Sequence, residues 1–177
     1  MERERIQKED FEQVRLLDPY KQIYMVYLSP HEIGDEIETT PFRIMHEPRI
    51  YEVRKELIRL IQEYDTSKEV NAFFVGERSV WLDKATRVGL VNSLHVQKES
   101  GLENTTLWMN GVGYDVNIDV ALAFLSQLEL YAIECYNVTQ RHIAEVRAMT
   151  DMDDLLAFDF TIGYPEKLAF GSPSSSE

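Results

Sequence analysis

One long amphipathic segment dominates the pattern of hydrophobic and polar positions, and it runs from Asp119 to Ala148 without proline or glycine. Its apolar side chains recur at alternating steps of three and four, the spacing that places side chains on one face of an α-helix. The stripe consists of Ile118, Ala121, Leu125, Leu128, Ala132, Cys135, Thr139, His142 and Val146, and it is widened by Phe124, Tyr131 and Val138. Such a helix is about 45 Å long, which is more than a compact domain of this size needs.

Shorter patterns predict the other elements. An apolar face at helical spacing predicts a helix over 49–64, and a capped run closed by Gly101 predicts another over 83–100. β-Branched and aromatic residues predict a strand over 22–28, and two further pairs of runs flank the turns Gly76-Glu77-Arg78 and Asn110-Gly111 as hairpins. Weaker predictions are a helix within 1–18, a strand over 42–45 inside an acidic linker at 31–48, and a short helix that Thr150 and Asp153 open as a capping box.

Together these elements predict an α+β fold. A small antiparallel sheet from the two hairpins would be packed by three helices, including the long one near 119–148, and the strand at 22–28 would extend that sheet or pair elsewhere. We expect residues 1–48 to be an N-terminal extension or docking segment, 49–170 to be the main domain, and 171–177, GSPSSSE, to be a flexible tail.

Composition and charge narrow the classes of partner. The 177 residues are 44% apolar, enough for a real core, and their net charge of -13 disfavours nucleic acid and anionic lipid surfaces. The first ten residues, MERERIQKED, lack the apolar stretch of a signal peptide, and no apolar run reaches the length of a membrane span. Cys135 is the single cysteine, so an intrachain disulfide is excluded. We expect a protein made in a cytoplasm, with no nucleic-acid and no membrane partner.

Candidate chemical groups each have a structural alternative. Cys135 and His142 share the stripe of the long helix but stand about 10 Å apart, beyond hydrogen-bond reach, so buried packing residues are the favoured interpretation. The remaining histidines have no metal-ligand spacing, and Asp151, Asp153 and Asp154 lack the calcium-loop pattern, so no metal and no cofactor are expected. Asp83 and Arg87, at i and i+4, predict a helix cap with an adjoining ion pair, and Asp119 a cap on the long helix.

The order of short motifs after residue 49 resembles a domain family of unassigned function found in bacteriophage tail-associated and tail-fibre proteins. The matching segments are VWLDKATRVGL, TTLWMNGVGYDVNID, LSQLELYAIECYN and DMDDLLAFDFTIGYPEKL. Within them, Trp81, Asp83 and Arg87 resemble the family's aromatic, aspartate and arginine, and Asp159 with Gly163-Tyr164-Pro165 resembles its closing motif. The sequence of these segments is similar to that of domains from phages of Bacteroides-like gut bacteria. About two thirds of the chain takes part, and residues 1–48 do not.

This resemblance implies a virion protein without enzymatic activity. The leading hypothesis is a structural or adaptor protein of a phage particle, associated with the tail or tail fibre and assembled in the host cytoplasm. It would bind other tail proteins and copies of itself, with Tyr131, Val138, His142, Ile143 and Val146 of the long helix as interface residues. The alternatives are a tail-fibre assembly chaperone absent from the mature virion and, less favoured, a hydrolase that uses Asp83, Asp115 and Asp159.

Overall fold

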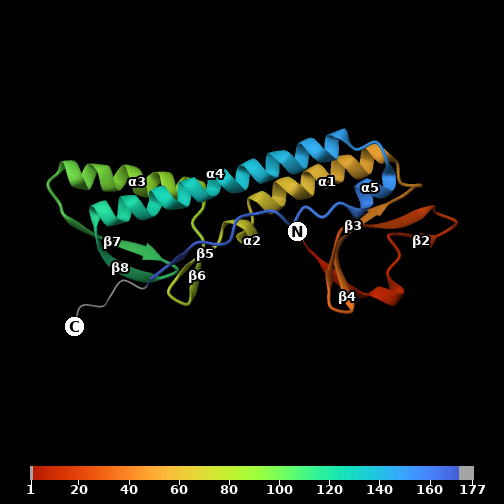
Figure 1. Ribbon diagram of the computed structural model, residues 1–177, viewed down its shortest axis with the longest axis horizontal. Coiled ribbons are helices and arrows are strands. Elements are labelled where there is room, and N and C mark those ends of the chain that lie inside the picture. The colour runs from red at the N-terminus through yellow and green to blue at the C-terminus, as the bar shows by residue number, and fades with distance from the viewer. Residues whose placement is uncertain (1, 172–177) are drawn as a thin grey trace. The chain divides into compact units, whose positions relative to one another are not determined.

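The protein is a mixed α+β chain, and the computed structural model describes residues 2–171 (Figure 1). It divides into two compact units that do not follow the order of the sequence. The first unit contains the chain up to Thr66 together with Asn137–Tyr164, and the second contains Ser67–Tyr136 and the chain from Pro165 onward. The predicted boundary at residue 48 coincides with neither limit. Most of the predicted tail, residues 172–177, lies outside the described residues.

An antiparallel sheet of four strands forms one side of the first unit, in the order β1-β4-β3-β2. Its strands are β1 (Glu4–Gln7), β2 (Val14–Asp18), β3 (Ile23–Ile33) and β4 (Glu36–Ile44), and a short 3-10 helix, η1 (Lys8–Asp10), follows β1. A tight turn at Gly34 joins β3 to β4, and its φ of 60° suits glycine. β3 is irregular between Leu28 and His31, where Ser29 takes a φ of 52° and Pro30 contributes no amide hydrogen to the ladder.

Two sequence predictions for the first 48 residues are wrong. The helix expected within 1–18 is replaced by β1, η1 and β2, because β1 pairs with β4 and β2 pairs with β3. The cross-strand ion pair Arg5–Glu38 favours this pairing, and Lys8 of η1 forms a further ion pair with Glu32 of β3. The acidic stretch 31–48 is mostly strand, not linker, since β4 begins at Glu36. The strand predicted over 22–28 is confirmed and continues to Ile33.

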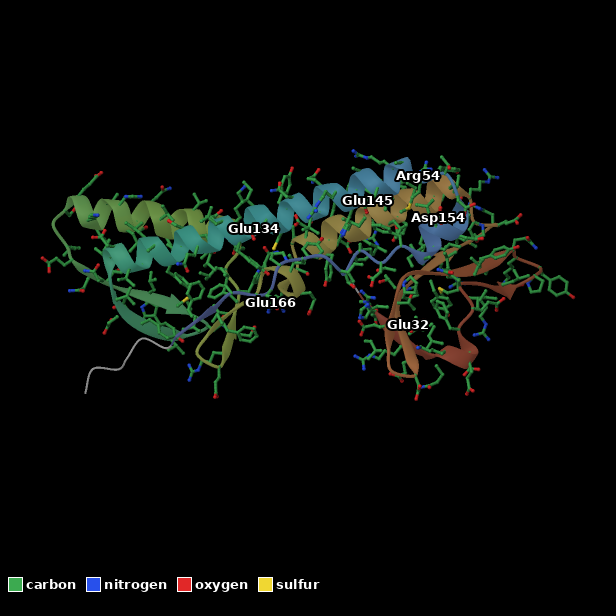
Figure 2. The ribbon with its side chains drawn as sticks, viewed as in Figure 1. Glu32, Arg54, Glu134, Glu145, Asp154 and Glu166 are labelled. Atoms are coloured by element: carbon green, nitrogen blue, oxygen red, sulfur yellow. The ribbon has the colours of Figure 1, made fainter. Side chains whose placement is uncertain are left out.

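Helices supply the rest of the first core. The predicted helix over 49–64 is confirmed as α1 (Ile50–Asp65), and α5 (Met152–Ala157) follows the last turn of α4 (Ile118–Ala148). The buried residues of this core come from the sheet, α1, the end of α4, α5 and the segment after α5: Val26, Leu28, Ile44, Val53, Leu57, Leu60, Ile61, Ile143, Val146, Leu155, Leu156 and Phe160. Arg54 of α1 donates from its Nη2 to the carbonyl of Met149 at 2.7 Å, which satisfies a backbone group at the end of α4 (Figure 2).

The second unit contains both predicted hairpins, but in separate sheets. β5 (Phe73–Val75) pairs with β6 (Arg78–Val80), and β9 (Ala169–Phe170) joins β5 in parallel, whereas β7 (Asn104–Met109) pairs only with β8 (Val112–Asn117). Asn110 and Gly111 both have positive φ, as the predicted turn requires. The prediction that both hairpins belong to one sheet is therefore wrong.

Two helices pack on these hairpins. They are α3 (Lys84–Glu99), which confirms the helix predicted over 83–100, and the part of α4 up to Tyr136, while α2 (Lys68–Asn71) is one short turn. Their shared core consists of Phe73, Val75, Val80, Leu82, Leu94, Leu107, Met109, Ile118, Ala121, Leu125 and Leu128. The long predicted helix is thus confirmed, and each unit's core takes apolar residues from a different part of it.

The capping box predicted before α5 is wrong by one residue. Asp151, not Thr150, is the N-cap, and its carboxylate accepts from the amides of Asp153 and Asp154 at 2.8 and 3.2 Å. Because an aspartate can satisfy two free amides at the start of a helix, the acidic cluster has a structural explanation.

Candidate functional site

The five residues predicted as an interface are all buried. Tyr131, Val138, His142, Ile143 and Val146 are each less than a tenth exposed. The Tyr131 hydroxyl donates to the carbonyl of Val70 at 2.7 Å within the second unit, and Ile143 and Val146 belong to the first core. These side chains offer no free surface to a partner, because the apolar stripe of α4 is used by the chain's own cores.

Asp83 caps α3 as predicted. Its carboxylate accepts from the Thr86 amide at 2.8 Å and from the Thr86 hydroxyl at 2.9 Å. The hydrogen bond from the Thr86 amide, followed by that from its hydroxyl, lowers the pKa of the Asp83 carboxyl. A carboxylate used in this way stabilises the first turn of a helix.

Removal of this cap gives a modest, local prediction. We expect Asp83→Ala to lower the free energy of unfolding modestly, because the Thr86 amide loses its acceptor. Chemical denaturation followed by tryptophan fluorescence measures it, since Trp81 and Trp108 both lie in the second unit. Asp83→Asn is the matched control, because an asparagine still caps, and it should recover most of the loss.

The ion pair predicted between Asp83 and Arg87 is not what the structure contains. Arg87 is buried, and its Nε donates to Glu129 of α4 at 2.6 Å while its Nη1 donates to the carbonyl of Leu82 at 2.7 Å. Acceptors on α4 and in the preceding loop take the guanidinium in place of the exposed Asp83 carboxylate. Arg87 therefore links α3 to α4 and to the end of the preceding loop.

Asp119 is not the cap of α4 either. The side chain of Asn117 accepts from the Asp119 amide at 2.9 Å and so performs that function. Asp119 lies in the first turn, where its carboxylate accepts from Lys98 of α3 at 2.5 Å. Negative charge there is still favourable for the helix.

A polar cluster around Asp159 joins distant segments of the first unit. Its Oδ1 accepts from the Ser29 hydroxyl at 3.1 Å, and from the Thr161 amide and hydroxyl at 2.9 and 2.7 Å. Its Oδ2 lies 2.8 Å from Nδ1 of His31. Burial raises the pKa of the Asp159 carboxyl, but the hydrogen bonds from Thr161, His31 and Ser29 outweigh it and hold that pKa below its usual value.

The Asp159 cluster contains serine, histidine and aspartate but not in the order of a catalytic triad. In a triad the histidine lies between the other two and takes the proton of the serine. Here Asp159 lies between them, and Ser29 is fully buried. The arrangement instead fastens the loop after α5 to the irregular part of β3. Sequence analysis missed Ser29 and His31 as partners, because Ser29-Pro30 indicates only the end of a strand.

The three carboxylates proposed for a hydrolase have separate surroundings. Asp83 caps α3, and Asp115 of β8 accepts from the Thr106 hydroxyl at 2.6 Å within its own hairpin. Asp159 belongs to the other unit and is held by its own donors. Each carboxylate thus has a structural function of its own. Within residues 2–171, no group of three or more histidine, cysteine, aspartate or glutamate side chains is placed to hold a metal ion.

His142 is buried between two aromatic rings. The ring centroids of Phe158 and Tyr164 lie 5.5 and 5.6 Å from it, both edge-on, and its Nδ1 has no hydrogen-bond partner among the described residues. Burial lowers the pKa of this imidazole, and Arg141 adds to that effect, while Glu145 and Asp159 oppose it. The structure therefore favours the neutral ring.

This environment predicts a pH dependence. A histidine whose folded pKa is below its unfolded pKa binds fewer protons when folded, so its stabilisation is present above about pH 6.5 and is lost as the pH falls toward the folded value. We expect the free energy of unfolding to fall between pH 7.5 and pH 5.5, and His142→Phe to reduce that slope. The exposed His95 is the matched control, and a similar reduction in His95→Phe would contradict the assignment.

The exposed apolar residues of α4 in the second unit form a different surface. Leu130 is 65% exposed and Ile133 is 58% exposed, and with Ala123 and Ser126 they follow one line along the helix at steps of three, four and three. We call these four residues the outer stripe. None carries a charge, although the chain carries -13. Sequence analysis missed the outer stripe, because the richer stripe on the opposite side of the helix accounted for the pattern.

The chain matches no protein-family model, and it shows no significant similarity to a curated protein or a solved structure. The resemblance to phage tail-associated domains therefore stays a prediction. Among the described residues no helix is long and apolar enough to cross a membrane.

The outer stripe is the candidate site that these observations leave. The candidate groups Asp83, Arg87, Asp119 and Asp159 all have partners that stabilise the fold. Large apolar side chains at the centre of a solvent-exposed helix face are characteristic of surfaces that bind another protein. The outer stripe is therefore the candidate functional surface of the second unit.

Proposed function

We propose that this chain is a non-enzymatic structural or adaptor protein of a bacteriophage particle, associated with the tail or tail fibre. The outer stripe of α4 is the observation that carries the proposal, because exposed Leu130 and Ile133 suit a protein contact. The ordered motifs around Trp81, Asp83, Arg87 and Asp159, which resemble tail-associated domains, supply the phage context. Its partners would be other tail proteins and copies of itself, and its place would be the virion tail after assembly in the host cytoplasm.

The structural functions of the polar residues support the non-enzymatic part of the proposal. The carboxylates of Asp83 and Asp159 accept hydrogen bonds from neighbouring threonines, and Arg87 is anchored on a backbone carbonyl. A general acid or base needs a group that can reach a substrate. Groups engaged in this way instead fix the relative positions of strands and helices within each unit.

Mass spectrometry of purified virions tests the proposal. We expect peptides of this chain to copurify with the tail proteins through a density gradient, at a constant ratio to them across the particle fractions. A major capsid protein serves as the positive control and an abundant host cytoplasmic protein as the negative control. If the chain is present in the lysate but absent from the particles, the proposal fails and an assembly chaperone replaces it.

A further inference from the structure

The outer stripe also points to a specific occupant, an inference that rests on the proposed function. We propose that the outer stripe binds a second copy of this chain in an antiparallel helix pair, with Leu130 of each copy packed on Ile133 of the other. The surface is Ala123, Ser126, Leu130 and Ile133, and its flanks are Gln127, Glu129, Glu134 and Tyr136.

The spacing of the outer stripe is that of a two-helix seam. Alternating steps of three and four keep one line of side chains facing a partner helix, and they continue at Asn137 and Gln140 along α4. Large side chains stand at the centre of the series, Leu130 and Ile133, and small or polar side chains stand on both sides of them. A series of this kind is compatible with its own reversal, as a two-fold axis requires.

The uncharged outer stripe is a place where two acidic copies can meet despite their net charge. Two chains of -13 repel each other, so a contact between them must lie where neither carries charge. The outer stripe is such a place, whereas Glu129 and Glu134 of α4 lie at its flank positions. A basic partner would gain from acidic positions within the stripe, and the stripe has none.

The flanking residues determine the direction. In a parallel pair the flank positions that face each other are five residues apart, which sets Glu129 against Glu134 of the second copy with like charges opposed. An antiparallel pair whose two-fold axis crosses α4 between residues 131 and 132 sets Gln127 against Glu134, and Tyr136 against Glu129. Each carboxylate then faces an amide or a hydroxyl donor.

Exposure is consistent with this arrangement. Tyr136 is 52% exposed, and the side chain of Glu129 is 41% exposed although its Oε1 accepts from Arg87. Its second carboxylate oxygen can therefore accept from the Tyr136 hydroxyl of the second copy. A helix pair of this length buries less area than a standard interface, so we expect a dissociation constant in roughly the micromolar range.

Sedimentation velocity on the full chain over roughly 1 to 500 µM tests the pairing. We expect concentration-dependent dimers, and we expect Ile133→Glu to raise the dissociation constant at least about tenfold, because each dimer would place two carboxylates in the seam. Val96→Glu, an exposed apolar position on α3 that is 63% exposed, is the matched control and should leave it unchanged. A chain that stays monomeric, or a dimer that Ile133→Glu does not weaken, overturns the inference.

Two substitutions at one flank position test the direction. Gln127→Lys places a cation against Glu134 of the second copy in the antiparallel pair and should lower the dissociation constant by about threefold, and Gln127→Glu should raise it similarly. In the parallel pair position 127 faces Leu122, and neither change has that effect. Equal dissociation constants for the two variants overturn the antiparallel direction.

The two proposals fail separately. A monomeric chain that copurifies with virions leaves the proposed function standing and overturns the dimer. A dimer that is absent from virions supports the pairing and overturns the proposed function.

Discussion

We expect Asp159→Ala to lower the free energy of unfolding of the first unit by about 2–4 kcal/mol. The carboxylate accepts four hydrogen bonds, from Ser29, His31 and Thr161, and hydrogen bonds to a charged group contribute more than neutral ones. Ser29 is fully buried, so its hydroxyl would be left without an acceptor in a place that water does not reach.

Hydrogen exchange measures the effect where it occurs. The Thr161 amide and the amides of β3 should exchange faster in Asp159→Ala, because the loop after α5 is no longer fastened to the irregular part of β3. Asp10→Ala removes an exposed carboxylate from the same unit and should change the free energy of unfolding by no more than about 0.5 kcal/mol. Equal effects of the two substitutions would show that the Asp159 hydrogen bonds do not contribute to stability.

The same carboxylate makes the first unit sensitive to acid. Its pKa is lower in the folded than in the unfolded chain, so its contribution is complete above about pH 4 and is lost as the pH falls through the folded value. Asp159→Asn should remove this part of the acid dependence while it keeps the shape of the side chain. An unchanged acid dependence of unfolding in Asp159→Asn would contradict the assignment.

Arg87→Ala is the second large change, and we expect it to lower the free energy of unfolding of the second unit by about 2–4 kcal/mol. The guanidinium is the donor to the Leu82 carbonyl and to Glu129, and its stem packs in the interior. A cavity of about 10 Å³ already lies beside it, lined also by Phe73, Leu128 and Tyr131, and the truncation would enlarge it.

Tryptophan fluorescence during denaturation measures the Arg87 effect, because Trp81 and Trp108 both lie in the second unit. Arg78→Ala is the matched control, since Arg78 is an exposed arginine on β6 of the same unit and its removal should cost about 0.5 kcal/mol or less. Arg87→Lys should recover only part of the loss, because one ammonium cannot reproduce the forked geometry that reaches Glu129 and Leu82. Full recovery with lysine would refute the argument from geometry.

Local patterns predicted those parts of the fold that depend on neighbouring residues. The apolar face of α1, the Asp83 cap and the turn at Asn110-Gly111 each rest on a few adjacent side chains, and each is confirmed. The strands within residues 1–18 depend on pairing with residues that come later in the chain, and the helical spacing of Ile6, Val14 and Leu17 concealed them.

The candidate site was less predictable, for a similar reason. The spacing of Asp83 and Arg87 is that of an ion pair, but it does not reveal that Glu129, 42 positions later, takes the arginine instead. The Asp159 carboxylate accepts a hydrogen bond from Ser29, which lies 130 positions earlier in the sequence. The outer stripe can be identified in the sequence only when the opposite face of α4 is known to be buried. The structure of the two cores supplies that information.

The interleaving of the two units bears on how the chain folds during synthesis. The first unit needs residues up to Tyr164, and the second needs β9, which ends at Phe170, beside β5. Synthesis must therefore pass Tyr164 before the first unit is complete and Phe170 before β9 can join β5, so neither unit can finish folding while residues 67–136 are still being made. Until those residues are synthesised, the apolar stripe of α4 lacks part of the surroundings that bury it in the native fold, and it is open to contacts with other proteins.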